Sequence, residues 1–233
     1  MIVHNSIDDH VDESLSQFLS IDRPESFFLF AGAGSGKTRS LVLALEGFRS
    51  NSGKYLRLNG KQIAVITYTN AACDEIKGRI GFDSVVHVST IHSFIWDLIQ
   101  GFNDDIRSWL IDELNRDIAE LQEQINKGRA GTKIAVEWAR SIESKRHRLE
   151  MLPAIKKFIY SPTGDNRSRD SLNHTEVIKI GAHFLSKKPL MQKMLISKFP
   201  FLLIDESQDT NKLLIDAFFS VQIAHCNLFG MGL

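Results

Sequence analysis

The sequence predicts an α/β protein in which a parallel sheet is interrupted by a large all-helical insertion. Three observations lead to this fold class. Short apolar runs alternate with helical patterns from residue 27 to residue 102, as they do in parallel sheets covered on both faces. Residues 103–200 then lack any comparable strand run. Finally, FPFLLIDE at 199–206 restores the strand pattern after the helical block.

Three buried strands are expected before the insertion, because three continuously apolar runs end at glycines or polar residues: FFLFAG at 27–32, QIAVITYT at 62–69 and SVVHVST at 84–90. Each is followed by a helical pattern: RSLVLALEGFR at 39–49, NAACDEIKGRI at 70–80 and IHSFIWDLIQGF at 91–102. Asn70 is the predicted N-cap of the second helix. The segment SGKYLRLNGK is predicted to be a turn-rich connection.

The insertion is predicted to be helical because its apolar residues recur every three or four positions, as at 106, 110, 114, 118, 121 and 125. Further helices are expected up to Pro153, and over 174–186 and 189–198, with a polar loop at 161–173. A strand at 199–210, the helix NKLLIDAFFS and a last strand at 224–230 complete the sheet. The expected domains are a core of 1–102 plus 199–233 and a helical insertion of 103–198.

Composition excludes several classes of protein. The 28 basic and 28 acidic side chains balance, so net charge favours no nucleic-acid partner and excludes none. The two cysteines and eight histidines show no metal-ligand spacing. No apolar run reaches the roughly 20 residues that cross a bilayer, and the acidic N-terminus does not resemble a signal peptide. We expect a soluble cytoplasmic protein.

The stretch AGAGSGKT at 31–38 predicts a phosphate-binding loop, since it links a buried strand to a helix that opens with Lys-Thr. Glycines let backbone N–H groups wrap a phosphate, and the helix start adds partial positive charge. Lys37 would reach the outer phosphates and Thr38 would ligate Mg²⁺. The alternative is an ordinary glycine-rich turn, because Ala31 stands where the pattern G-x-x-x-x-G-K-S/T begins with glycine.

A second carboxylate-bearing strand is needed to hold the metal, and LLIDE supplies one that ends in Asp205 and Glu206. Asp205 can position Mg²⁺ and Glu206 can orient or deprotonate the attacking water. Adjacent acids are also common on surfaces, which is the alternative. In a chain that also carries a phosphate loop, the pair indicates ATP hydrolysis.

Four motifs together, AGAGSGKT, VITYTNAACDEIKGRI, VSTIHSF and LLIDESQDTN, resemble the superfamily 1 DNA helicases of the UvrD/Rep type over roughly residues 25–230. That family has a RecA-like P-loop NTPase core, and alanine is usual where Ala31 stands. The resemblance implies ATP and Mg²⁺ as cofactors, with Thr38 and Asp205 as metal ligands and Lys37, Glu206 and Gln208 as catalytic residues. Asp209 would help Gln208 couple hydrolysis to movement. It also implies a set of nucleotide-binding residues: Gly32, Ala33, Gly34, Ser35, Gly36, Lys37, Thr38 and Arg39.

The same resemblance implies a single-stranded DNA track formed by Thr67, Tyr68, Thr69, Asn70, Thr90 and His92. An aromatic ring at Tyr68 can stack on a base without reading sequence. Ile91 replaces the phenylalanine that is usual in the family's T-F-H element. In the alternative interpretation, Tyr68 only ends a buried strand and His92 bonds within its own helix.

Other polar positions have weaker indications of function. Gln17 lies roughly where the family keeps an adenine-reading glutamine, and an exposed helix position is the alternative. The basic run KRHR at 145–148, with Lys156, Lys157, Arg167 and Arg169, suits duplex phosphates or a solvated helix face.

The family continues after LFG with G-D-x-x-Q and a second RecA-like domain, where this sequence reads GMGL. We therefore expect an N-terminal portion of a helicase that binds ATP–Mg²⁺, hydrolyses it slowly and does not unwind DNA alone. The alternative is a non-unwinding, ATP-gated DNA-binding or adaptor subunit that acts with a nuclease in repair or phage defence. Implied partners are single-stranded DNA, duplex DNA at the insertion, and a nuclease or a chain supplying the second domain.

Overall fold

The computed structural model describes residues 18–27, 37–128, 132–205 and 211–232. The chain packs as two compact units. The first, called here the sheet unit, comprises residues 1–98 and 181–233, and the second, the helical unit, comprises residues 99–180. Residues 181–198, which the sequence analysis places in the insertion, therefore pack with the sheet.

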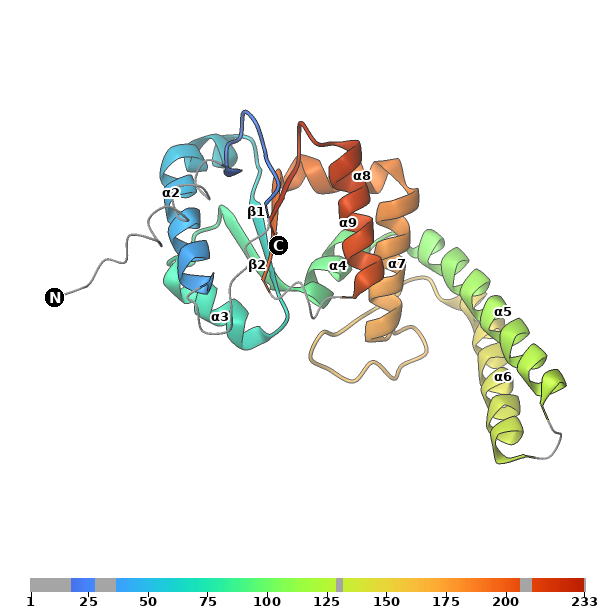
Figure 1. The fold of residues 1–233 in the computed structure, drawn as a ribbon. Helices are drawn as coiled ribbons and strands as arrows, with labels where there is room; N and C mark the ends of the chain where they lie inside the picture. Colours follow the sequence, from blue (N-terminus) through green and yellow to red (C-terminus); the bar gives the residue numbers. More distant parts are fainter. Residues whose placement is uncertain (1–17, 28–36, 129–131, 206–210, 233) are drawn as a thin grey trace. The chain divides into compact units, whose positions relative to one another are not determined.

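The sheet has four described strands, all parallel, in the order β2-β1-β3-β4 (Figure 1). They are β1 (Ile63–Thr67), β2 (Val86–Thr90), β3 (Phe201–Ile204) and β4 (Gly230–Gly232). Every residue of β1 and β3 is buried, which explains their unbroken apolar sequences. The prediction of a parallel α/β fold is confirmed. Of the predicted first strand, Phe27 forms a parallel bridge with Gly232, and residues 28–32 lie outside the described part.

Helices cover both faces of this sheet (Figure 1). On one face, α2 (Lys37–Leu58) and α3 (Asn70–Arg79) pack through Phe48 and Ile76 on a cluster that includes Val65. On the other, Phe94 of α4 (Ile91–Ile99) contacts Phe199 and Phe218, the latter from α9 (Lys212–Ala224). Between them in sequence lie α7 (His174–Lys187) and α8 (Pro189–Lys198). Gly181 of α7 is required there, because a Cβ at that position would lie 2.3 Å from Ile95.

Two expected elements differ from the observed ones. The segment predicted as a turn-rich connection continues α2 to Leu58, and the chain turns only at Gly60, whose positive φ of 63° suits glycine. The last strand is predicted over 224–230, but the observed β4 comprises only Gly230–Gly232. Residues 225–228 form a turn after α9, in which the backbone N–H of Phe229 donates to the carbonyl of His225.

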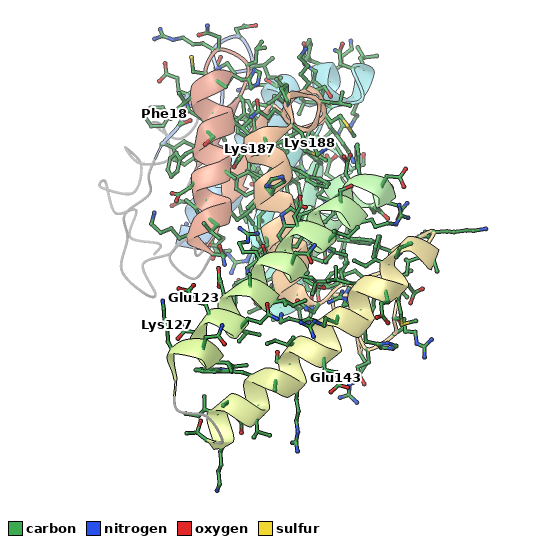
Figure 2. All side chains as sticks on the ribbon, turned by 90° about the vertical axis from the view of Figure 1, so that its right-hand side faces the viewer. Phe18, Glu123, Lys127, Glu143, Lys187 and Lys188 are labelled. Atoms are coloured by element: carbon green, nitrogen blue, oxygen red, sulfur yellow. The ribbon has the colours of Figure 1, made fainter. Side chains whose placement is uncertain are left out.

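The helical unit is built on a hairpin of α5 (Asn103–Lys127) and α6 (Lys133–Met151), followed by the 3₁₀ turn η1 (Leu152–Ala154). Figure 2 shows the two helices side by side, with Glu123 and Lys127 at the C-terminal end of α5 and Glu143 exposed on α6. The polar loop after η1 is closed at its base, because Ile159 and Ser171 form a parallel bridge. The predicted helical character of this region is confirmed.

Candidate nucleotide and DNA site

The predicted phosphate loop lies largely outside the described residues. The predicted site residues outside the described part are Gly32, Ala33, Gly34, Ser35, Gly36, Glu206, Gln208 and Asp209, together with the side chain of Lys37. The structure does show that α2 begins at Lys37, directly after the glycine-rich stretch. Thr38 is half-buried and Arg39 is exposed in its first turn. The helix start thus stands where the sequence analysis expects it.

Three of the predicted segments leave the sheet at the same edge. Thr67 ends β1 and pairs in register with Thr90, which ends β2. On the other side of β1, Ile66 pairs with Ile204, the last residue of β3. The backbone N–H of Asp205 then donates to the carbonyl of Ile66 over 2.8 Å. Because neighbouring strands lie about 4.8 Å apart, the carboxyl ends of β1, β2 and β3 form one continuous edge.

The turn after β1 has a buried and an exposed side. Thr67 is buried, and its hydroxyl bonds to the carbonyl of Thr69 over 2.9 Å and to the Cys73 thiol over 2.8 Å. Burial raises the pKa of that thiol, so it stays protonated. The Tyr68 ring is 52% exposed, and Asn70 is exposed too. This arrangement leaves Tyr68 and Asn70 open to a ligand, while the Thr67 side chain is used inside the protein.

The cap of α3 differs from the sequence-based assignment. The predicted N-cap was Asn70, but Thr69 has the extended backbone of a cap residue, and its hydroxyl accepts the N–H of Ala72 over 3.2 Å. Asn70 is therefore the first helical residue, and its amide is not needed for capping. The signal was present in the sequence, because threonine is also a favoured N-cap residue and Thr69 lies only two residues after the end of β1.

The segment after β2 is built in the same way. The Thr90 hydroxyl is buried, lies 3.0 Å from the Ser93 hydroxyl and accepts the Ser93 N–H over 3.4 Å. Ile91 is buried, and His92 is half-buried. The isoleucine that replaces the family's phenylalanine thus packs in the core. The sequence analysis does not predict a role for Cys73 or Ser93. Cys73 follows Thr67 by six residues and Ser93 follows Thr90 by three, and each bonds to that strand-ending threonine.

No described helix has both the length and the apolar content needed to cross a membrane. An α/β unit with a helix that opens at a glycine-rich Lys-Thr and an acid after a buried strand of the sheet defines a nucleoside-triphosphatase-type domain.

Comparisons with known proteins agree with this class. Residues 20–232 match the family model described as AAA domain, and the chain belongs to that family. It is similar to the N-terminal region of UvrD/Rep-type superfamily 1 helicases.

Three relatives illustrate this similarity. The chain is 26% identical to Gabija protein GajB of Bacillus cereus strain HuB5-5, over 85% of this chain and 38% of that protein. It is 26% identical to ATP-dependent DNA helicase Rep of Buchnera aphidicola subsp. Baizongia pistaciae, over 78% of this chain and 30% of that protein. It is 24% identical to the probable DNA helicase II homolog of Mycoplasma pneumoniae, over 88% and 32% respectively. The chain thus spans 30% to 38% of the length of these relatives.

Proposed function

We propose that this chain is the ATP-binding and single-strand-binding part of an ATP-dependent DNA helicase or translocase of the UvrD/Rep type. The observation that carries the proposal is the shared edge of the sheet. The two segments expected to contact DNA follow β1 and β2, and the acid expected to hold the metal follows β3. Open parallel sheets bind ligands at the carboxyl ends of their strands.

The donor atoms of the predicted site suit ATP and Mg²⁺. The Thr38 hydroxyl and the Asp205 carboxylate are oxygen ligands of the kind that Mg²⁺ prefers. Gly32 to Thr38 would bind the triphosphate, with Lys37 neutralising its outer phosphates, and Arg39 would lie near the base or ribose. The bound metal would withdraw charge from the phosphates. Glu206 would orient the attacking water, and Gln208 would sense the state of the nucleotide.

Single-stranded DNA fits the exposed side of the turn after β1. The Tyr68 ring offers a stacking surface, while Thr69 and Asn70 offer polar groups suited to phosphate oxygens. The buried Thr67 holds the turn in place through Thr69 and Cys73. Thr90 and His92 extend the track along the neighbouring strand.

The two ligands would be coupled through the backbone. Asp205 is fixed to β1 by its hydrogen bond to Ile66, which lies two residues before Tyr68. A shift of the metal-bearing strand end therefore acts directly on the strand that carries the DNA turn. This hydrogen bond would therefore couple a movement of Asp205, caused by a change of the bound nucleotide, to the end of β1.

The proposal is tested with the 233-residue chain, a fluorescent ATP analogue with Mg²⁺, and a labelled oligo-dT strand. Lys37→Ala should weaken nucleotide binding at least tenfold. Tyr68→Ala should weaken oligo-dT binding roughly 5- to 150-fold, since stacking contributes about 1–3 kcal/mol per base, and should leave nucleotide binding unchanged. The matched control is Tyr55→Ala, which removes a 44% exposed ring from α2. Equal losses for Tyr68 and Tyr55 variants would refute the DNA track.

Hydrolysis is tested separately by Glu206→Gln, which keeps the size of the side chain and removes its charge. If the chain acts through hydrolysis, its ATPase rate and its activity in cells should both be lost while ATP binding is retained. Retained cellular activity would instead identify a nucleotide-gated DNA-binding subunit.

A further inference from the structure

We propose that the edge of the sheet where its strands begin is a docking surface for an acidic, partly apolar segment of a partner protein. This amino-end surface lies at the opposite ends of the strands from the predicted nucleotide and DNA segments. It consists of the four segments that lead into the strands, residues 54–62, 80–85, 190–200 and 223–229. All four belong to the sheet unit.

Hydrogen bonds join the first three of these segments. The Arg57 guanidinium donates to the Asp83 carboxylate over 2.8 and 3.1 Å. The side chain of Gln62 donates to the Ser84 carbonyl over 2.7 Å. The backbone N–H of Gln62 donates to the carbonyl of Lys198 over 2.8 Å. The end of α2, the turn before β2 and the end of α8 are therefore neighbours.

The fourth segment is joined to the third in the same way. The backbone N–H of Gly230 donates to the Pro200 carbonyl over 3.0 Å. The side chains of His225 and Gln192 lie 3.2 Å apart, which places the turn after α9 beside the first half of α8. The four segments thus form one continuous surface.

This surface carries the most exposed apolar side chains that the structure describes. They are Leu58 and Phe82 at 77%, Ile223 at 74%, Leu190 at 62% and Leu228 at 61%. Single exposed apolar residues are ordinary on a protein surface. A group of them gathered on one side of a domain instead marks an interaction site.

Phe82 is the clearest sign that this surface has a partner. It has a φ of 55° and is the one described residue other than glycine with a positive φ. Asparagine or glycine would adopt this backbone at lower cost than a large ring. The ring is also mostly exposed, so core packing does not explain it. An exposed aromatic ring on a strained turn is suited to act as an anchor for a binding partner.

The helix α8 is apolar on two sides. Met191 and Leu195 are buried against the sheet unit, at a spacing of one helical turn. Leu190 and Met194 have the same spacing and are exposed. A surface helix normally carries polar residues on its outer side, so this outer apolar stripe is suited to contact with another protein.

The charge of the surface indicates the chemistry of the partner. Its four segments contain five lysines and arginines but a single acid, Asp83. That carboxylate is already engaged, because it accepts hydrogen bonds from Arg57 and from the backbone N–H of Val85. The other cations form no ion pair with any residue in the described ranges: Lys54, Lys61, Lys193 and Lys198. A partner with complementary charge is therefore acidic.

A protein segment fits this surface better than a second copy of the chain or a bilayer. Two copies would bring like charges together. Polar side chains such as Gln62, His225 and Asn227 lie among the apolar ones, and a hydrocarbon interior could not hydrogen-bond them. A polypeptide supplies carboxylates, apolar side chains and backbone hydrogen bonds together.

The partner would not compete with ATP or single-stranded DNA. The five residues of β1 separate the two edges of the sheet, a distance of roughly 16 Å at about 3.3 Å per residue. Variants of the amino-end surface should therefore keep wild-type binding of the ATP analogue and of oligo-dT. These two measurements separate a failure of this proposal from a failure of the proposed function.

The test selects peptides from a random phage-displayed library on the 233-residue chain. Peptides that also bind a variant with Phe82→Asn and Leu58→Ser are removed. Asparagine tolerates a positive φ, so the variant should fold. The remaining peptides should be enriched in Asp and Glu together with Leu, Phe or Met. No enrichment, or enrichment of basic or uncharged peptides, would overturn the proposal.

One enriched peptide is then labelled and its affinity measured by fluorescence anisotropy. Replacing its acids with Asn and Gln should weaken binding roughly tenfold. Ile223→Ser with Leu228→Ser should weaken it roughly fivefold, as expected for loss of apolar anchors. An unchanged affinity in either measurement would overturn the proposal.

The matched control is Leu213→Ser with Ile134→Ser, which removes two exposed apolar side chains outside this surface. It should change the affinity by less than about twofold, and an equal loss in the control would overturn the proposal. Two further results would also overturn it. One is tighter binding to phosphatidylserine vesicles than to the peptide, and the other is self-association of the chain that the Phe82→Asn, Leu58→Ser variant loses.

Discussion

Different interactions stabilise the interior of the sheet unit and the interior of the helical unit. In the sheet unit, β1 and β3 are buried along their whole length, and Ile63, Ile66 and Phe201 are no more than 1% exposed. In the helical unit, α6 has 19 residues and Ile142 is the only one described as buried. Its partner α5 buries five of 25. The strands of the sheet unit are buried throughout, whereas the α5–α6 hairpin of the helical unit buries few apolar residues.

Ion pairs accompany the few apolar contacts of this hairpin. Lys145 of α6 pairs with Asp117 of α5 over 2.5 Å, Arg148 of α6 with Glu176 of α7 over 2.5 Å, and Lys179 of α7 with Glu113 of α5 over 2.8 Å. Each pair joins a different combination of the three helices. The lesson is that a long amphipathic hairpin with a thin apolar seam is held in register by charge, and such contacts weaken with salt.

The largest effect is expected from a matched pair of core truncations. Ile66→Ala should cost about 3–5 kcal/mol and Ile142→Ala about 1–3 kcal/mol, because Ile142 lies on a sparsely buried helix that can relax around the lost atoms. Urea unfolding can separate the units in a Trp96→Phe background, where the remaining tryptophans, Trp109 and Trp138, both lie in the helical unit. Equal costs for the two variants would contradict the comparison.

A smaller effect is expected when one cross-helix charge is removed. Glu176→Gln preserves the cap of α7, because glutamine can also accept the Asn173 N–H, but it leaves Arg148 without a charged partner. The helical unit should lose about 1–3 kcal/mol, and its remaining stability should depend less on salt. The control is Lys212→Ala, which breaks an exposed pair with Asp216 in the sheet unit and should cost under about 0.5 kcal/mol. A salt dependence unchanged in Glu176→Gln would argue against charge-held packing.

The two units also differ in how well their sequences predict them. The apolar runs of β1 and β3 and the alternating helices predict the parallel sheet correctly, since burial on both faces leaves a direct pattern. The extension of α2 was missed because Asn51, Ser52 and Gly53 favour a turn. In the structure the fully buried Leu56 and the pairing of Arg57 with Asp83 hold these residues in a helix, so tertiary contacts override local propensity.

The candidate site was predictable in its location but not in the roles of its side chains. The strand ends predict the shared edge at Thr67, Thr90 and Asp205. Strand alternation does not predict the role of Thr67, because β1 is buried on both faces. The sequence predicts a ligand contact for its hydroxyl, which in the structure bonds to Thr69 and Cys73. The three cross-helix ion pairs were not predictable, because pairing between helices depends on their register and not on either sequence alone.

A pH effect is expected in the sheet unit. Burial lowers the pKa of His87 from its ordinary 6.5, Lys198 lowers it further, and Asp97 opposes this. The unfolded chain therefore binds a proton that the folded chain does not, and stability present above pH 6.5 is lost as pH falls toward the folded pKa, by about 1.4 kcal/mol per unit of pKa difference.

This effect can be assigned by substitution. Among the described residues, Nε2 of His87 has no hydrogen-bond partner, and its ring lies against Phe94 and Phe199. His87→Phe should therefore fold and flatten the stability profile between pH 5 and 7. His147→Gln, at an exposed position of the helical unit, should leave the profile unchanged. A profile that is equally steep in His87→Phe would assign the proton uptake to another group.

The smallest stability effect compares one cap in each unit. Thr69 caps α3 and Thr132 caps α6, each accepting a backbone N–H over 3.2 Å, so Thr69→Ala and Thr132→Ala should each cost about 1 kcal/mol. Their functional effects should differ. Thr69 also accepts, through its carbonyl, the hydrogen bond from Thr67 that fixes the turn beside Tyr68, so losing the cap should weaken oligo-dT binding several-fold. Thr132→Ala should leave oligo-dT binding unchanged, because the Thr132 hydroxyl only caps α6. A loss of oligo-dT binding in both variants would show that the turn after β1 has no special role.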